Sequence, residues 1–176
     1  ADFVRSQGLI DNRVAALGSM CRDVSAANKD LKDLQKSLKE QTSPNATAFA
    51  SQANDIRERL IKDFKAQLVA YKANGGAPKA VAFLNSQIDE LKILKFSNSG
   101  DPKKASAEYV NAMLGKINQL QKGLLPEILA MAESFKGATP EEARKMRLIA
   151  EGVEDFSSAY TTLQSAAELH KSFTKK

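Results

Sequence analysis

The sequence predicts an all-α protein, an up-down-up-down four-helix bundle with additional C-terminal helices. Apolar residues recur at alternating steps of three and four through several long segments. This spacing places one apolar stripe along one face of a helix. Short segments containing proline, glycine and asparagine separate the stripes. Because an apolar stripe has to be buried against another element, helices of this kind are expected to assemble into a bundle.

The first two helices are predicted at 12–41 and 47–73, after a loosely ordered segment at 1–11. The first stripe consists of Val14, Leu17, Cys21, Val24, Asn28, Leu31, Gln35 and Leu38. The second stripe consists of Phe49, Ala53, Ile56, Leu60, Phe64, Leu68 and Tyr71. The polar Asn28 and Gln35 either fix the register of the bundle or mark a place where the helix turns out of the core.

The third helix is predicted to start at Pro78 and to end near Phe96. It follows a Gly75-Gly76 turn, because glycine accepts the left-handed conformation that ends a helix. The fourth helix begins at Asp101-Pro102, a capping acid followed by a proline in the first turn. The two stripes are Val81, Leu84, Ile88 and Leu91, then Val110, Leu114, Ile117, Leu120 and Leu124. The bundle is therefore expected to span 12–124.

The remaining residues, 125–176, are predicted to form a helical extension that packs on or beside the bundle. Gly123 and Pro126 are expected to break or kink the fourth helix. A short fifth helix is then predicted at 126–135, and a final helix at 140–173. The final helix has its own stripe, which consists of Met146, Ile149, Val153, Phe156, Tyr160, Leu163, Ala167 and His170.

The residue types in the chain offer little catalytic chemistry. The sequence contains one histidine, His170, and one cysteine, Cys21. Neither can build a metal site or an intrachain disulfide alone, and Cys21 on an apolar stripe is typical of a small buried hydrophobe. There is no glycine-rich phosphate-binding motif and no nucleophile motif. We therefore predict a non-catalytic protein without a cofactor or a metal.

The charge distribution favours an acidic partner. The formal net charge is +5, and Lys92, Lys95, Lys103 and Lys104 flank one predicted turn with Asp101 as the only acid among them. These lysines either form a docking site for an acidic protein surface or only improve solubility. The chain has no aromatic stacking platform and no recognition helix, so nucleic acid is not the expected partner. It also lacks a run of 18 apolar residues, which predicts a peripheral rather than a membrane-spanning protein.

The middle of the chain resembles the PsbQ family of extrinsic photosystem II subunits. The resemblance is carried by 86–91 (SQIDEL), Tyr109, 116–120 (KINQL) and the second helix around 59–69, and it covers roughly 50–124. It implies a four-helix bundle in the thylakoid lumen that binds photosystem II subunits and helps to retain the calcium and chloride needed for water oxidation. It implies no catalytic residue. The start at Ala1, without Met, is expected to reflect either trimming of the chain or removal of a targeting segment.

Two other classes of protein remain open. The first is an exported carrier, secreted or periplasmic, that opens its bundle for an apolar ligand or a lipid surface. Asn28 and Gln35 would then mark a loosened seam, but the narrow stripes differ from the broad apolar faces of lipid-binding bundles. The second is a secreted module that binds a cell-surface partner.

Overall fold

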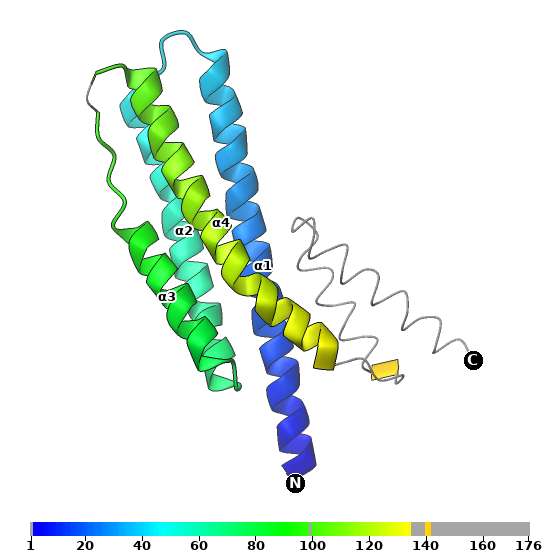
Figure 1. Ribbon diagram of the computed structural model, residues 1–176. Helices are drawn as coiled ribbons and strands as arrows, with labels where there is room; N and C mark the ends of the chain where they lie inside the picture. The colour runs from blue at the N-terminus through cyan, green and yellow to red at the C-terminus, as the bar shows by residue number, and fades with distance from the viewer. Residues whose placement is uncertain (1, 99, 135–139, 142–176) are drawn as a thin grey trace.

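The computed structural model describes residues 2–98, 100–134 and 140–141, and the regular structure in this part of the chain is entirely helical. The helices are α1 (Asp2–Glu40), α2 (Ala46–Ala73), α3 (Pro78–Lys92) and α4 (Pro102–Ser134). Figure 1 shows them side by side, each running opposite to the one before it. The predicted all-α class is confirmed. The predicted final helix at 140–173 lies almost wholly outside the described residues.

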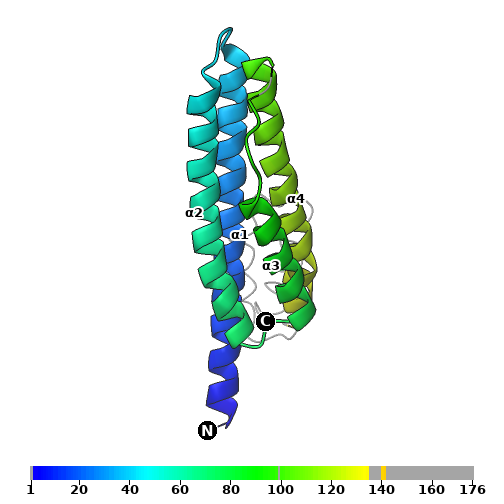
Figure 2. The same ribbon diagram turned by 90° about the vertical axis from the view of Figure 1, so that its left-hand side faces the viewer.

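The helices pack so that two of them occupy opposite corners of the bundle. α1 packs against α2 and α4, and α3 packs against the same two helices. α2 and α4 also touch each other, whereas α1 and α3 make no contact within the described residues. Figure 2 shows the first turns of α1 extending past the other described helices. No described helix combines the length and the apolar character needed to cross a membrane.

The core consists mainly of the predicted stripes. Its largest fully buried side chains are Phe64, Leu17, Met20, Leu31, Leu38, Leu68, Leu84, Ile88, Leu91, Met113 and Ile117. The polar positions on the α1 stripe are half-buried instead. Gln35 Nε2 donates a hydrogen bond to Asn111 Oδ1 on α4 at 2.6 Å. This contact links the register of α1 to that of α4, so Gln35 does not simply turn away from the bundle.

Short polar residues cap the helices at the turns. The side-chain oxygen of Asn45 accepts a hydrogen bond from the Ala48 amide at 3.1 Å, so α2 begins directly after this residue. Asp101 Oδ1 accepts from the Lys103 amide at 3.0 Å and starts α4 in the same way. Such caps satisfy amides that have no partner inside the helix. α2 ends before Gly75, whose φ of 89° is a left-handed conformation that suits glycine.

The N-terminal segment differs from its prediction. Residues 1–11 were expected to be loosely ordered, but α1 already begins at Asp2, and Gly8 lies inside it. A glycine in a helix interior costs only about 1 kcal/mol relative to alanine. Helix formation is cooperative, so extending an existing helix is far easier than starting one. The long buried face of α1 therefore carries the helix through Gly8.

α3 is shorter than its stripe suggested. It ends at Lys92 rather than near Phe96, and a non-helical segment continues to the start of α4. In this segment Leu94 carbonyl oxygen accepts a hydrogen bond from Arg57 Nη1 at 2.5 Å. The Phe96 ring packs on Tyr109 with 5.4 Å between ring centroids. These tertiary contacts hold the segment over the core in an extended path and replace the helical bonds that a longer α3 would have made.

The predicted break near residue 125 is absent, and the expected separate fifth helix is part of α4. Pro126 lies inside α4, on an exposed face. The apolar stripe continues past it through Ile128 and Met131, both of which are buried. Gly123 does not end the helix either. A Cβ atom there would lie 2.7 Å from the Phe83 ring of α3, so this glycine permits the close approach of α3 and α4.

Leu60→Ala is expected to lower the unfolding free energy by about 2–5 kcal/mol, because it opens a cavity in the core. Leu60 is 3% exposed. Val69→Ala on the same helix is the control, because Val69 is 69% exposed and its loss should change stability by about 0.5 kcal/mol or less. Urea denaturation measures both values. Equal midpoints for the two variants would contradict the assignment of Leu60 to the core.

Gly123→Ala and Gly115→Ala are expected to change stability in opposite directions. At Gly115 a Cβ atom meets nothing within 4 Å, so alanine should add about 0.5–1 kcal/mol of stability through helix propensity. At Gly123 the Cβ atom would press on Phe83 and on the buried Leu84, and overpacking of this kind costs about 1–3 kcal/mol. Thermal and urea unfolding of both variants give the comparison. Stabilisation by Gly123→Ala would show that α3 and α4 do not meet at this glycine.

Candidate functional site

The predicted docking lysines lie along the connection between α3 and α4. Lys92 is the last residue of α3 and Lys95 follows it in the extended segment, and both are exposed. Lys103 and Lys104 lie in the first turn of α4. Figure 1 shows that this connection runs along the bundle from the end of α3 to the far end, where α4 begins. The lysines are therefore spread along one edge of the bundle and do not crowd a single turn.

Lys103 has a specific contact that explains its half-buried position. Its ammonium group donates a hydrogen bond to the Lys39 carbonyl oxygen in the last turn of α1, at 3.4 Å. The carbonyl groups at a helix C-terminus carry partial negative charge and attract a cation. This contact shows that the end of α1 and the start of α4 are neighbours.

This contact brings lysines of α1 and α4 together at one end of the bundle. We define the basic end as Lys36, Lys39, Lys103 and Lys104. Lys36, Lys39 and Lys104 are exposed, and Glu40 and Asp101 are the acids on the same helix ends. Sequence reasoning found the α4 lysines but missed Lys36 and Lys39. The signal for these two was weak, a pair of lysines near a helix C-terminus, and only the tertiary contact joins them to residues 64 positions away.

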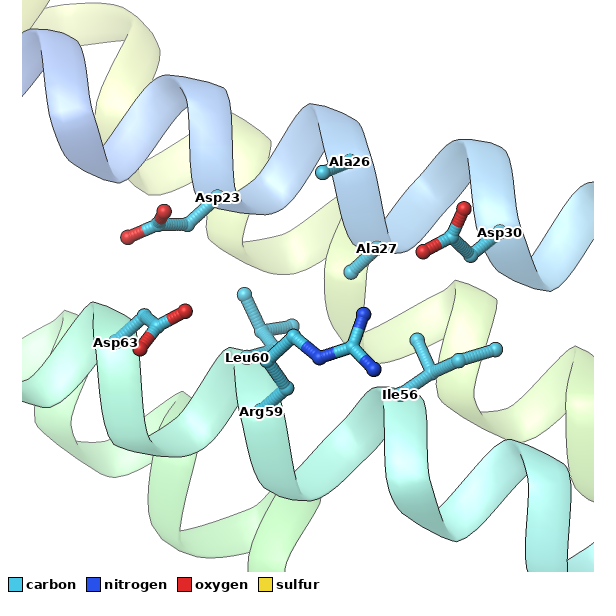
Figure 3. Close-up of a pocket in the computed structure, with 8 residues that line it drawn as sticks. All are labelled: Asp23, Ala26, Ala27, Asp30, Ile56, Arg59, Leu60 and Asp63. Atoms are coloured by element: carbon cyan, nitrogen blue, oxygen red, sulfur yellow. The ribbon is translucent and has the colours of Figure 1, made fainter.

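A second charged feature lies in a shallow recess between α1 and α2. Figure 3 shows Asp23 of α1 opposite Asp63 of α2, with the Arg59 side chain running along the seam beneath Ala27 toward Asp30. The recess has a volume of about 60 Å³, which suits one or two water molecules rather than an organic ligand.

The chemistry of this recess is dominated by Asp23. Its Oδ2 atom is buried and accepts no hydrogen bond within the described part of the chain. Burial of the carboxyl group and repulsion by Asp63 raise the pKa of Asp23 to about 6, while Arg22 opposes the shift. The residues that the structure describes contain no group of histidine, cysteine, aspartate or glutamate side chains arranged to hold a metal ion.

The two residues with nucleophilic or ligand chemistry do not form a site in the described structure. Cys21 is completely buried in the core, and burial raises the pKa of its thiol, which keeps it protonated and unreactive. His170 lies outside the described residues.

Comparison of the chain with protein-family models, with curated proteins and with solved structures gives no match in any of the three.

The unfolding free energy is expected to fall as the pH rises through about 6. The folded chain holds the Asp23 proton more tightly than the unfolded chain, in which the pKa is near 3.8. This stabilisation is complete below the unfolded pKa and is lost as the pH rises through the folded pKa. Asp23 is half-exposed, so solvent screening reduces the expected effect to about 1 kcal/mol.

Urea denaturation between about pH 4.5 and about pH 7.5 measures this effect across the transition. Asp23→Asn should flatten the dependence of the unfolding free energy on pH around pH 6. Asp30→Asn, on the same side of α1, is the control and should keep the pH dependence of the parent. An unchanged profile in the Asp23 variant would assign the effect to another group.

Proposed function

We propose that this chain is a non-catalytic accessory protein that docks onto an acidic protein surface of a membrane complex. In its specific form, the proposal is a PsbQ-like extrinsic subunit, peripheral to the membrane in the thylakoid lumen. It would bind photosystem II subunits there and support oxygen evolution by helping to retain calcium and chloride. The resemblance over roughly 50–124 suggests this partner, and the all-helical architecture is compatible with it.

The observation that carries the docking proposal is the row of lysines along the α3–α4 connection and the basic end. Ammonium groups along one edge present a patterned positive surface, which steers association with an acidic partner and sets its orientation. Lys103 is held in place by α1, so part of this surface is ordered before binding. The net charge of +5 acts in the same direction.

The second candidate is an exported carrier or interaction protein. The observation that favours a ligand-binding role is a cavity of about 230 Å³ where the α2–α3 turn meets α1 and α4. Its lining includes Arg13, Tyr71 and Glu127, so it does not suit the purely apolar ligand of the carrier hypothesis.

Replacing Lys92, Lys95, Lys103 and Lys104 together by Gln is expected to weaken binding to photosystem II membranes that have been stripped of extrinsic subunits. Each exposed ion pair contributes about 0–1 kcal/mol, so the four changes should weaken binding by about 1–3 kcal/mol in total. Rebinding is measured over a salt series, and the binding of the parent should fall as salt rises because exposed charges are screened.

The control is a second quadruple variant with Lys29, Lys32, Lys62 and Lys72 changed to Gln, which removes the same charge from exposed positions on α1 and α2. If both variants lose the same affinity, net charge rather than the α3–α4 edge drives binding. If the parent does not rebind to these membranes at all, the photosystem II assignment is wrong.

A further inference from the structure

The larger cavity lies at the end of the bundle where the α2–α3 turn closes against α1 and α4. Figure 2 shows this turn beside α1, close to the end from which α1 extends. Arg13 comes from α1, Tyr71 from α2, and Glu127 and Met131 from α4, while the turn supplies Gly75. The cavity is partly open to solvent, and its volume of about 230 Å³ is larger than the roughly 150 Å³ of an enclosed engineered cavity that takes up benzene. The cavity can therefore hold a small organic molecule.

The guanidinium group of Arg13 is positioned before any ligand binds. Its Nε donates a hydrogen bond to the Asn74 carbonyl oxygen at 2.8 Å, and Asn12 Nδ2 donates to Asn74 Oδ1 at 3.3 Å. A Cβ atom at Gly75 would lie 2.6 Å from Arg13 Nη2, so the glycine leaves room for the guanidinium. The Nε contact leaves the two Nη groups of Arg13 available to a ligand in the cavity. A planar guanidinium can bind a carboxylate through two parallel hydrogen bonds.

Glu127 of α4 also lines the cavity, and a contact with α2 fixes its position. The Tyr71 hydroxyl donates a hydrogen bond to Glu127 Oε1 at 2.7 Å. Burial and the hydrogen bond to Glu127 raise the pKa of Tyr71, so the phenol remains a proton donor. The carboxylate keeps its second oxygen and further lone pairs for a donor from a ligand.

Arg13 and Glu127 line the same cavity without forming an ion pair with each other. A simple anion in the cavity would be repelled by the negative charge of Glu127, and a simple cation would be repelled by the positive charge of Arg13. An apolar ligand would remove water from both charged groups without replacing their hydrogen bonds. A molecule that carries both charges satisfies both groups at once.

We propose that this cavity binds a small zwitterion, a free α-amino acid or a molecule of the same chemistry. Its carboxylate pairs with the Nη groups of Arg13, and its ammonium group donates to Glu127. Met131 and Ala77 provide an apolar wall for a side chain. This inference is independent of the docking function, because the cavity lies on α1, α2, the α2–α3 turn and α4 and does not include the docking lysines.

Calorimetric titration of the full chain with each of the common free L-amino acids tests the proposal. At least one is expected to bind in the micromolar to millimolar range. Its N-acetyl derivative lacks the ammonium group and its methyl ester lacks the carboxylate, so each should bind about tenfold or more weakly, because each loses one charge-assisted interaction. Failure of every amino acid to bind at millimolar concentration overturns the proposal. So does equal binding of the blocked derivatives.

Two variants locate the binding. Glu127→Gln keeps an acceptor for Tyr71 but removes the negative charge, and Arg13→Gln removes the guanidinium. Each should weaken binding by about tenfold or more. Glu58→Gln and Arg59→Gln are matched controls at exposed positions outside the cavity, and they should bind as the parent does. Circular dichroism verifies that each variant is folded. If Glu58→Gln loses as much affinity as Glu127→Gln, or Arg59→Gln as much as Arg13→Gln, the ligand binds elsewhere. Either result overturns the proposal.

If Arg13→Gln fails to fold because its contact with Asn74 is lost, the comparison of Glu127→Gln with Glu58→Gln and the two blocked derivatives still decide the question. A folded Glu127→Gln variant that binds the amino acid with the affinity of the parent contradicts the assignment of Glu127 to the ammonium group and overturns the proposal.

Discussion

The short length of α3 is the constraint on which much of the structure depends. α3 has 15 residues, whereas α2 has 28 and α4 has 33. With a rise of about 1.5 Å per residue, α3 is about 22 Å long and α4 about 50 Å. The rest of this corner of the bundle has to be covered by extended chain. Leu94 and Phe96 do this through their contacts with Arg57 and Tyr109, and Tyr109 in turn donates a hydrogen bond to Asn54 of α2.

The same constraint determines where the positive charge lies. Because the chain leaves α3 halfway along the bundle, Lys92 and Lys95 are separated from the first turn of α4 by the extended segment. The α4 lysines meet the C-terminal end of α1 instead, where Lys103 contacts the Lys39 carbonyl group. An acidic partner would therefore meet an elongated edge. A partner that follows this edge can make several weak ion pairs, none of which is strong alone.

The opposite end of the bundle is organised by one turn. Asn74 receives hydrogen bonds from Asn12 and Arg13 of α1, and its own amide nitrogen donates to Ala70. These contacts join the first and second helices at a place where Tyr71 also reaches Glu127 on α4. The turn brings a fixed cation and a fixed anion to one cavity. The seam between α1 and α2 holds the partly buried carboxyl group of Asp23, whose pKa is raised by burial and by Asp63. The bundle thus has a lysine-rich edge that runs toward the basic end, and a charged cavity at the opposite end.

The sequence by itself determined the helical class, the four main helices and most of the core, because burial of an apolar stripe depends on a spacing that is local and regular. Leu60, Phe64, Leu84 and Ile117 were assigned to the core in this way, and all are buried. The cap at Asp101 and the turn at Gly75 could also be predicted from the sequence, since each depends on neighbouring residues.

The tertiary structure alone decided the end of α3, the uninterrupted path of α4 through Gly123 and Pro126, and the meeting of Lys39 with Lys103. It also decided the cavity, whose charged residues Arg13 and Glu127 are far apart in the chain and belong to different helices. These features depend on contacts between residues tens of positions apart. Helical periodicity predicts which face of a helix is buried. It contains no information on which neighbouring helix covers that face, or at which position along the helix the two meet.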